Sequence, residues 1–308
     1  MAWAQEAKEP PRVEFVVPNS PGGANDTIAR ILQHSLVSGK ILTSPSVILN
    51  KPGGAGDVTL SYLTQKSNHP GEVAVVSVTQ QLNYIVGTSE YKYTEYTPLA
   101  MLVEDYVGFA VKADSPLKSG QDIIDALKKD PKSLSFAITG FGGVNHIPVL
   151  ELAHEIGVDG KQLKTPVFDS SGDSATALMG GHVDVVIGSA GNLAEHAKSG
   201  LIRILALSSP ERLPGLPDVP TWKEQGVNVV IGSWRGLWGP KNMKPEEIAY
   251  WDAAIAKATR SDEWQQQLKN NMWGDAVKNA ADTKKQLDDD EKTLVTLLSG
   301  LGLAKKTD

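Results

Sequence analysis

Apolar and polar positions follow two alternating patterns along the first hundred residues: short apolar runs typical of buried strands, and longer stretches with helical spacing. The runs that predict strands are 13–17 (VEFVV), 46–50 and 72–78. Between them, Ile28, Ile31 and Leu36 fall on one face of a helix predicted over 25–38, and a second helix is predicted over 58–65. This order predicts a parallel sheet covered by helices.

The same alternation resumes after a change of pattern at 99–114, where LAMLVEDYVGFAVKAD predicts a pair of strands or one long strand that leaves the first sheet. The elements predicted beyond it are strands at 134–140, 183–189 and 202–208 and helices at 120–128, 147–156, 173–180 and 192–198. After a Pro-rich stretch, segment 229–240 is predicted to return to the first sheet, and helices fill 245–298. The chain therefore predicts two α/β units.

Composition narrows the kind of partner. At 308 residues the chain exceeds the usual size of one core, so two lobes are expected. The net charge of −6 argues against nucleic acid or an anionic membrane surface, because both select basic proteins. The absence of cysteine excludes disulfides, thiolate catalysis and cysteine-bound zinc. The six histidines form no H-x-x-x-H pair, so no metal site is predicted.

The N-terminus indicates export. Ala2-Trp3-Ala4 has the A-x-A pattern that ends a secretory signal, which makes Gln5 the expected first mature residue and the periplasm the expected location. A disordered tail or a segment added for expression is the alternative. No apolar run approaches the roughly 18 residues of a membrane span, which predicts a soluble mature protein.

Three turns that lead from a strand into a helix carry the residues best suited to a ligand. Glycine lets backbone amides approach a ligand, and the first turn of a helix supplies unpaired N–H groups and partial positive charge, so an anion can bind there without a basic side chain. Each turn alone is equally typical of an ordinary α/β protein, but three of them in two units favour a ligand site. The turns are Ser20-Pro21-Gly22-Gly23-Ala24-Asn25-Asp26, Thr139-Gly140-Phe141-Gly142-Gly143-Val144-Asn145-His146 and Asp169-Ser170-Ser171-Gly172-Asp173-Ser174.

Three charged or titratable side chains near these turns each have two interpretations. Asp26 is interpreted mainly as a capping or first-turn residue, with ligand contact as the alternative. His146 is a packing residue or faces the ligand. Arg235 either clamps a ligand carboxylate bidentately or pairs with an aspartate inside the protein.

Enzyme motifs are missing from the sequence. PGGAGD lacks the G-x-G-x-x-G spacing of a dinucleotide site, GSWRG lacks the spacing of a nucleophile elbow, and the second turn lacks the Lys-Ser/Thr end of a P-loop. We therefore expect no enzyme activity, no catalytic residue and no cofactor.

Several motifs taken together resemble one family. The series PNSPGGANDTIAR, VILNKPGGAGDV, SFAITGFGGVNHI, TALMGGHVDVVIGS, LPGLPDVPTWKEQG and SWRGLWGPKNM resembles the extracytoplasmic solute receptors of the tripartite tricarboxylate transporters, also called Bug receptors, over the whole chain after about Arg12. The resemblance implies a type II periplasmic-binding-protein (Venus flytrap) fold with two α/β lobes and a hinge crossed twice. The resemblance, taken together with the changes of sequence pattern along the chain, predicts the boundaries. Lobe 1 is predicted at 5–103 plus 222–308, lobe 2 at 104–221, and the hinge near 103–106 and 219–223.

The resemblance also implies a site and a function. A ligand carboxylate is held mainly by backbone amides and small side chains of two turns, Ser20 to Asp26 and Phe141 to His146, while Thr79, Gln80 and Ser170 to Gly172 line the far end. The expected function is capture of a small organic acid, a di- or tricarboxylate such as citrate, by a monomer that delivers it to membrane permease subunits. A receptor that presents its ligand to a sensor kinase is the first alternative. A carboxylate-processing enzyme is the second, with Asp26 or His146 as its only candidate base.

Overall fold

The computed structural model describes residues 8–66, 69–168, 171–300 and 302–305. The predicted signal-peptide remnant Ala2-Trp3-Ala4 and the predicted site residue Ser170 lie outside the described residues.

The first sheet is mixed in direction. Strands β1 (Val13–Val17), β2 (Ser46–Asn50) and β3 (Glu72–Ser77) are parallel, in the order β2-β1-β3. Next to them, β8 (Gly232–Gly239) is antiparallel to β3, and β4 (Thr97–Lys112) is antiparallel to β8 and to β9 (Gly274–Lys278). The parallel arrangement predicted for the first three strands is thus confirmed. Segment 229–240 joins the same sheet as predicted, in the antiparallel direction, because β8 enters from the second unit rather than through a crossover helix.

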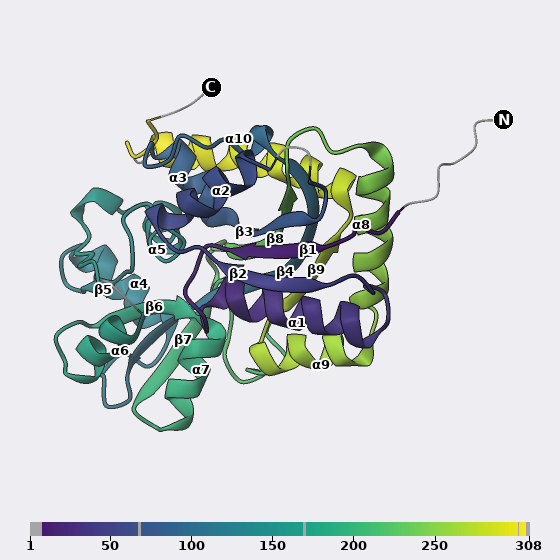
Figure 1. Cartoon of the computed structure of the whole chain (residues 1–308). Helices are drawn as coiled ribbons and strands as arrows, with labels where there is room; N and C mark the ends of the chain where they lie inside the picture. Colours follow the sequence, from purple (N-terminus) through teal and green to yellow (C-terminus); the bar gives the residue numbers. More distant parts are fainter. Residues whose placement is uncertain (1–7, 67–68, 169–170, 301, 306–308) are drawn as a thin grey trace.

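Helices cover both faces of this sheet, as Figure 1 shows. On one face lie α1 (Ala24–Ser38), α8 (Pro245–Ala258) and α9 (Asp262–Asn271), packed on Val73 and Val75 of β3. On the other lie α2 (Asp57–Thr64), α3 (Val78–Ile85) and α10 (Ala280–Gly300), packed on Ala74 and Val76. The alternation along β3 explains why this strand is apolar throughout: both of its faces are buried.

Strand β4 connects the two units as one long strand. Its residues up to Tyr106 pair with β8, and from Val107 it pairs with β6 (Val185–Ser189) and β7 (Ile202–Leu207) in a second sheet, to which β5 (Phe136–Ala137) is added beside β6. The second sheet carries α4 (Gly120–Lys129), α5 (Ile147–Glu155), α6 (Ser171–Met179) and α7 (Ala190–Lys198), which lie to the left and below in Figure 1. Four short 3₁₀ helices complete the described elements: η1 (Gly54–Gly56), η2 (Tyr93–Glu95), η3 (Gly160–Gln162) and η4 (Lys223–Gln225).

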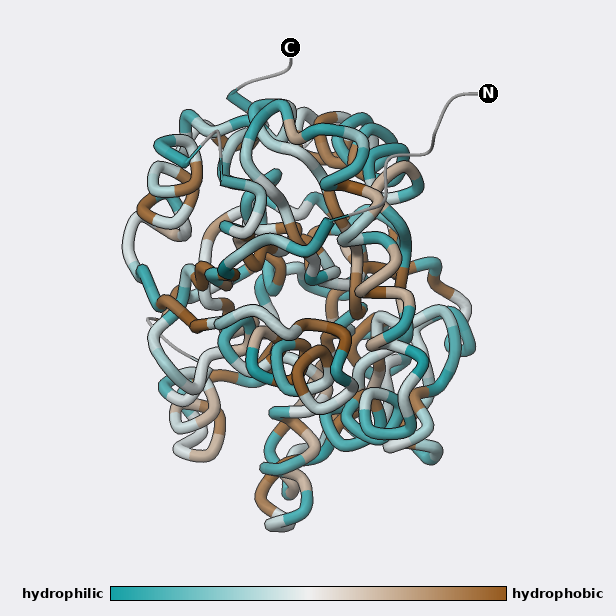
Figure 2. Tube along the Cα trace, turned by 45° about the vertical axis from the view of Figure 1, so that its right-hand side comes forward, coloured by the Kyte–Doolittle hydropathy of each residue, from teal (hydrophilic) through white to brown (hydrophobic). Residues whose placement is uncertain are grey.

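The second unit has its own core, which reaches further along the chain than its predicted end. Trp222 is fully buried there, with its ring centroid 4.8 Å from that of Phe109 in an edge-to-face contact, and Val229 packs in the same cluster. This packing indicates that the chain returns from the second unit to the first after Val229. The lobe boundaries themselves stay a prediction. Brown and teal segments alternate along the outer helices in Figure 2, as expected for helices that bury one face. None of the helices in the described ranges combines the length and the apolar character that crossing a membrane requires.

Candidate ligand-binding cleft

A cleft of about 640 Å³ lies where the two sheets meet. Its wall comes from both units: the turn before α1, the ends of β3 and β8, the middle of β4, the turn before α5, and the starts of α6 and α7. The end of α9 contributes Asn270 and Asn271, and Trp273 follows them. The wall is rich in asparagine, serine and threonine.

Five helices begin at this cleft. The wall includes a residue within two positions of the start of each: Ala24 for α1, Thr79 for α3, Asn145 for α5, Ser171 for α6 and Asn192 for α7. Each of these helices has at least eight residues. Because a helix N-terminus is equivalent to about half a positive charge, their convergence makes the cleft favourable for an anion although the whole chain is acidic.

The first turn uses its glycine amides internally. Gly22, at φ +85°, donates its N–H to Oδ2 of Asp26 at 2.9 Å, and Gly23 donates to the carbonyl of Ser20 at 3.1 Å. The next two residues, Ala24 and Asn25, lie on the wall, and among the described residues no acceptor receives a hydrogen bond from their backbone N–H groups. The donors open to a ligand are therefore these two, and not the glycine amides.

The second turn has the same arrangement. Gly142 donates its N–H to Nδ1 of His146 at 2.9 Å, and Gly143 donates to the carbonyl of Gly140 at 3.2 Å. Val144 and Asn145 lie on the wall, and within the described ranges their backbone N–H groups donate to no acceptor. In both turns, the glycines shape the chain and the residues after them present the free donors.

Asp26 holds the first turn together. Burial disfavours its charged form, but hydrogen bonds from Arg30, Gly22 and Asn50 outweigh burial and lower the pKa of Asp26 to about 2. Its carboxylate is therefore ionised and fully engaged. This arrangement supports the first-turn interpretation of Asp26.

His146 has a comparable role in the second turn. It is buried, accepts the Gly142 N–H through Nδ1, and its ring centroid lies 4.5 Å from that of Phe141, which is itself 62% exposed. Burial lowers the pKa of His146 to about 4, so the imidazole is neutral at neutral pH. The geometry fits a packing residue that orients a glycine turn.

Arg235 and Asp105 form a buried ion pair on the cleft wall. Nη1 of Arg235 donates to Oδ2 of Asp105 at 2.9 Å, and the hydroxyl of Ser189 donates to the other carboxylate oxygen at 2.8 Å. Both interpretations of Arg235 therefore have a structural basis: the side chain pairs with an aspartate and it also lines the cleft.

The structure divides the other predicted residues between the wall and its support. Gln80 caps α3, accepting from the backbone of Ser77 at 2.8 Å and donating to the carbonyl of Ala55 at 3.3 Å. Of the predicted residues that the structure describes, those on the wall are Gly22, Gly23, Asn25, Thr79, Val144, Asn145, Ser171 and Arg235, and those that do not line it are Ser20, Asp26, Gln80, Phe141, Gly142, Gly143 and His146.

Sequence reasoning missed part of the wall. Ser189, Gly191 and Asn192 form a fourth strand-to-helix turn, at the start of α7, with the same type of sequence as the three predicted turns. Ser233 lies near the start of β8 and Asp105 in the middle of β4. No local pattern there distinguishes a cleft residue from any other polar strand residue.

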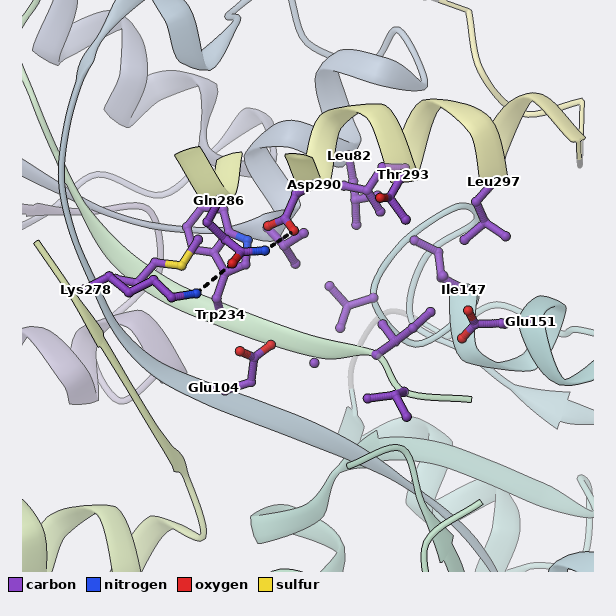
Figure 3. Close-up of a pocket in the computed structure, with 17 residues that line it drawn as sticks. Leu82, Glu104, Ile147, Glu151, Trp234, Lys278, Gln286, Asp290, Thr293 and Leu297 are labelled. Atoms are coloured by element: carbon purple, nitrogen blue, oxygen red, sulfur yellow. Dashed lines mark hydrogen bonds between the residues drawn. The ribbon is translucent and has the colours of Figure 1, made fainter. Parts of the chain in front are cut away.

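A second pocket, of about 240 Å³, lies on the opposite face of β4 and β8 (Figure 3). Strand alternation sends Glu104 and Trp234 into it, whereas their neighbours Asp105 and Arg235 line the cleft. Burial, reinforced by the nearby Asp290 carboxylate, raises the pKa of Glu104 to about 7. Figure 3 shows α10 above this pocket, with Asp290 pointing into it. In the part of the chain that the structure describes, no group of three or more histidine, aspartate or glutamate side chains is arranged to hold a metal ion.

Comparison with known proteins gives one consistent family. The family described as "Tripartite tricarboxylate transporter family receptor" matches residues 28–303. A curated relative, protein BugT of Bordetella pertussis, is 30% identical over 260 residues, which cover 81% of this chain and 76% of the relative.

Solved structures share the fold. A protein of R. palustris solved with adipate superimposes with a TM-score of 0.82 at 21% identity, covering 98% of this chain and 99% of that one. MatC of Rhodopseudomonas palustris, solved with bound malate, gives a TM-score of 0.77 at 23% identity, covering 93% of this chain and 99% of that one. At these identities the likeness establishes the two-lobed periplasmic-binding-protein fold.

Proposed function

The chain belongs to the tripartite tricarboxylate transporter receptor family, and from this premise we propose that it captures a small organic carboxylate in the cleft between its two units. The observation that carries the proposal is the convergence of five helix N-termini on one cleft, two from the first unit and three from the second. Each contributes partial positive charge where an organic acid needs it.

The free backbone donors supply the affinity. Hydrogen bonds to a charged group contribute about 1.5–3 kcal/mol each, and a micromolar ligand needs only about 8 kcal/mol in total. The amides of Ala24 and Asn25 in one unit, and of Val144 and Asn145 in the other, therefore suffice for a carboxylate together with a few polar side chains.

The position of these donors on both units also suggests how ligand binding is coupled to closure of the two units. A ligand that bridges both turns stabilises the closed arrangement of the units, because only there can it reach both sets of amides. We propose that the closed, monomeric receptor delivers its ligand to membrane permease subunits in the periplasm. Its family, and structural neighbours with bound malate and adipate, support this role.

Isothermal titration calorimetry tests the proposal. Purified protein is titrated with malate, adipate and citrate, and with the dimethyl ester of adipate as the uncharged control. At least one acid is expected to bind at micromolar concentration without being converted, and the ester is expected not to bind. Failure of every carboxylate in a wider screen of di- and tricarboxylates, sugar acids and aromatic acids contradicts the proposal, and the appearance of a reaction product points to an enzyme instead.

A further inference from the structure

Several polar side chains on the cleft wall have no hydrogen-bond partner among the residues that the structure describes. Asn25 is 7% exposed and Ser233 is 5% exposed, yet in the described ranges no hydrogen bond is formed by either side chain. The side chains of half-buried Thr79 and exposed Asn192 likewise form no hydrogen bond within the described residues, and Oδ1 of Asn19 is buried without a partner. The polar groups of Asn25, Thr79, Asn192 and Ser233 are open to the cleft, so a ligand that displaces water from them has to supply hydrogen-bond partners in its place.

The chemistry of these side chains indicates what the partners are. Amides and hydroxyls offer both donors and acceptors, and a ligand hydroxyl also does both, whereas an ionised carboxylate only accepts. An aliphatic or aromatic ligand body would leave these amides and hydroxyls unpaired. A site built from polar groups discriminates most strongly against a ligand that cannot pair with them. The unpartnered groups therefore match hydroxyls along the ligand body.

The charges on the wall agree with this reading. Among the described residues, the charged side chains on the wall are Asp105, Arg235 and Glu195, and Arg235 is neutralised by Asp105. Attraction for the ligand's carboxylates comes mainly from the helix N-termini, which leaves the side chains to recognise uncharged polar groups. Only a few wall residues are apolar, among them Val107, Val144 and Trp273.

We propose that the ligand is a polyhydroxylated acid of the sugar-acid class, with a carboxylate at the amides of the first turns of α1 and α5 and hydroxyls on Asn25, Ser233 and their unpartnered neighbours. This inference rests on the proposed function, since it places the acid in the same cleft.

A matched pair of ligands tests it. Glucarate and adipate are both six-carbon diacids and differ by four hydroxyls, so calorimetric titration of both isolates the hydroxyl contribution. We expect glucarate to bind at least tenfold more tightly than adipate. If adipate equals or exceeds glucarate, or if the only carboxylates that bind carry no hydroxyls along their body, the inference is overturned and carboxylate capture stands. If no carboxylate binds at all, carboxylate capture fails as well.

Two variants assign the effect to the wall. Asn25→Ala and Ser233→Ala are each expected to weaken glucarate binding about tenfold and to leave adipate binding within a few-fold. Asn228→Ala, at an exposed position outside the cleft wall, is the matched control and should change neither. Equal losses for both diacids in the folded variants contradict the assignment. The two positions lie on different elements, so one substitution can disturb folding without the other. Either variant that unfolds at the same temperature as the wild-type protein is sufficient for the test.

Discussion

Glu104 and Asp105 are consecutive on β4, but their carboxylates lie on opposite faces of that strand. Asp105 lines the cleft and pairs with Arg235 of β8 at 2.9 Å, whereas Glu104 enters the pocket under α10. Both carboxylates therefore sit where β4 leaves the first sheet for the second. One is held by an ion pair and the other is buried near further carboxylates, so their removal has different consequences.

Removing a single backbone donor tests the amide site. Ala24→Pro deletes the N–H at the first position of α1, where proline is tolerated, and Gly23 before it has an extended backbone (φ −71°, ψ 163°) compatible with a following proline. We expect carboxylate affinity to fall about 10- to 100-fold, the loss of one charge-assisted hydrogen bond. Calorimetry measures it, with Ala24→Ser, which keeps the amide, as control. Unchanged affinity in Ala24→Pro contradicts donation by this amide.

Breaking the buried ion pair separates stability from binding. Asp105→Asn leaves the Arg235 charge without its partner, which is expected to lower the free energy of unfolding by about 3 kcal/mol. The same change frees the guanidinium for the ligand, so carboxylate affinity should rise about tenfold. Urea unfolding and calorimetry measure the two effects. Asp114→Asn, whose pair with Lys112 is largely exposed, is the control and should change neither. A destabilised variant with unchanged affinity shows that Arg235 does not contact the ligand.

Asp26→Asn tests whether this carboxylate is structural. It loses charge-assisted hydrogen bonds from Arg30 and Gly22, so the free energy of unfolding should fall by about 1–3 kcal/mol at pH 7. Since folding lowers the pKa of Asp26 from 3.8 to about 2, the stability it provides is present above pH 3.8 and is lost as the pH falls towards 2. The difference between the two proteins should therefore shrink between pH 4 and pH 2. Carboxylate affinity should stay within a few-fold at pH 7, and a large gain would show that the charge of Asp26 opposes the ligand.

Glu104→Gln tests the second pocket through its pH dependence. Folding raises the pKa of Glu104 from 4.5 to about 7, so the folded state binds the extra proton between these values and this stability is lost as the pH rises through 7. The wild-type protein should therefore lose more stability between pH 5.5 and pH 8 than Glu104→Gln, by about 2 kcal/mol. Urea unfolding at both pH values measures the difference. Parallel pH profiles for the two proteins would falsify the raised pKa.

The sequence predicts which turns contribute to the candidate site, but not which of their backbone N–H groups are free. Glycine-rich sequences between an apolar strand and an amphipathic helix indicate where helix N-termini lie, and two of the three predicted turns bring residues to the cleft, as does Ser171 of the third. Which donors in those turns are free was not predictable. The free donors are set by Asp26 and His146, because each of these side chains accepts the N–H of the glycine four residues before it.

The sequence by itself left open whether 99–114 forms one long strand or a pair, and it did not predict α3 or β9. It determined most of the order of the remaining strands and helices and the polar turns that end the strands. These are local properties, because apolar periodicity records which face of an element is buried. Tertiary structure decided the antiparallel entry of β8, the contact between Arg235 and Asp105, which are 130 residues apart, and the meeting of five helix N-termini at one cleft. These relationships join segments far apart in the chain, and strand pairing, which no local pattern encodes, brings them together.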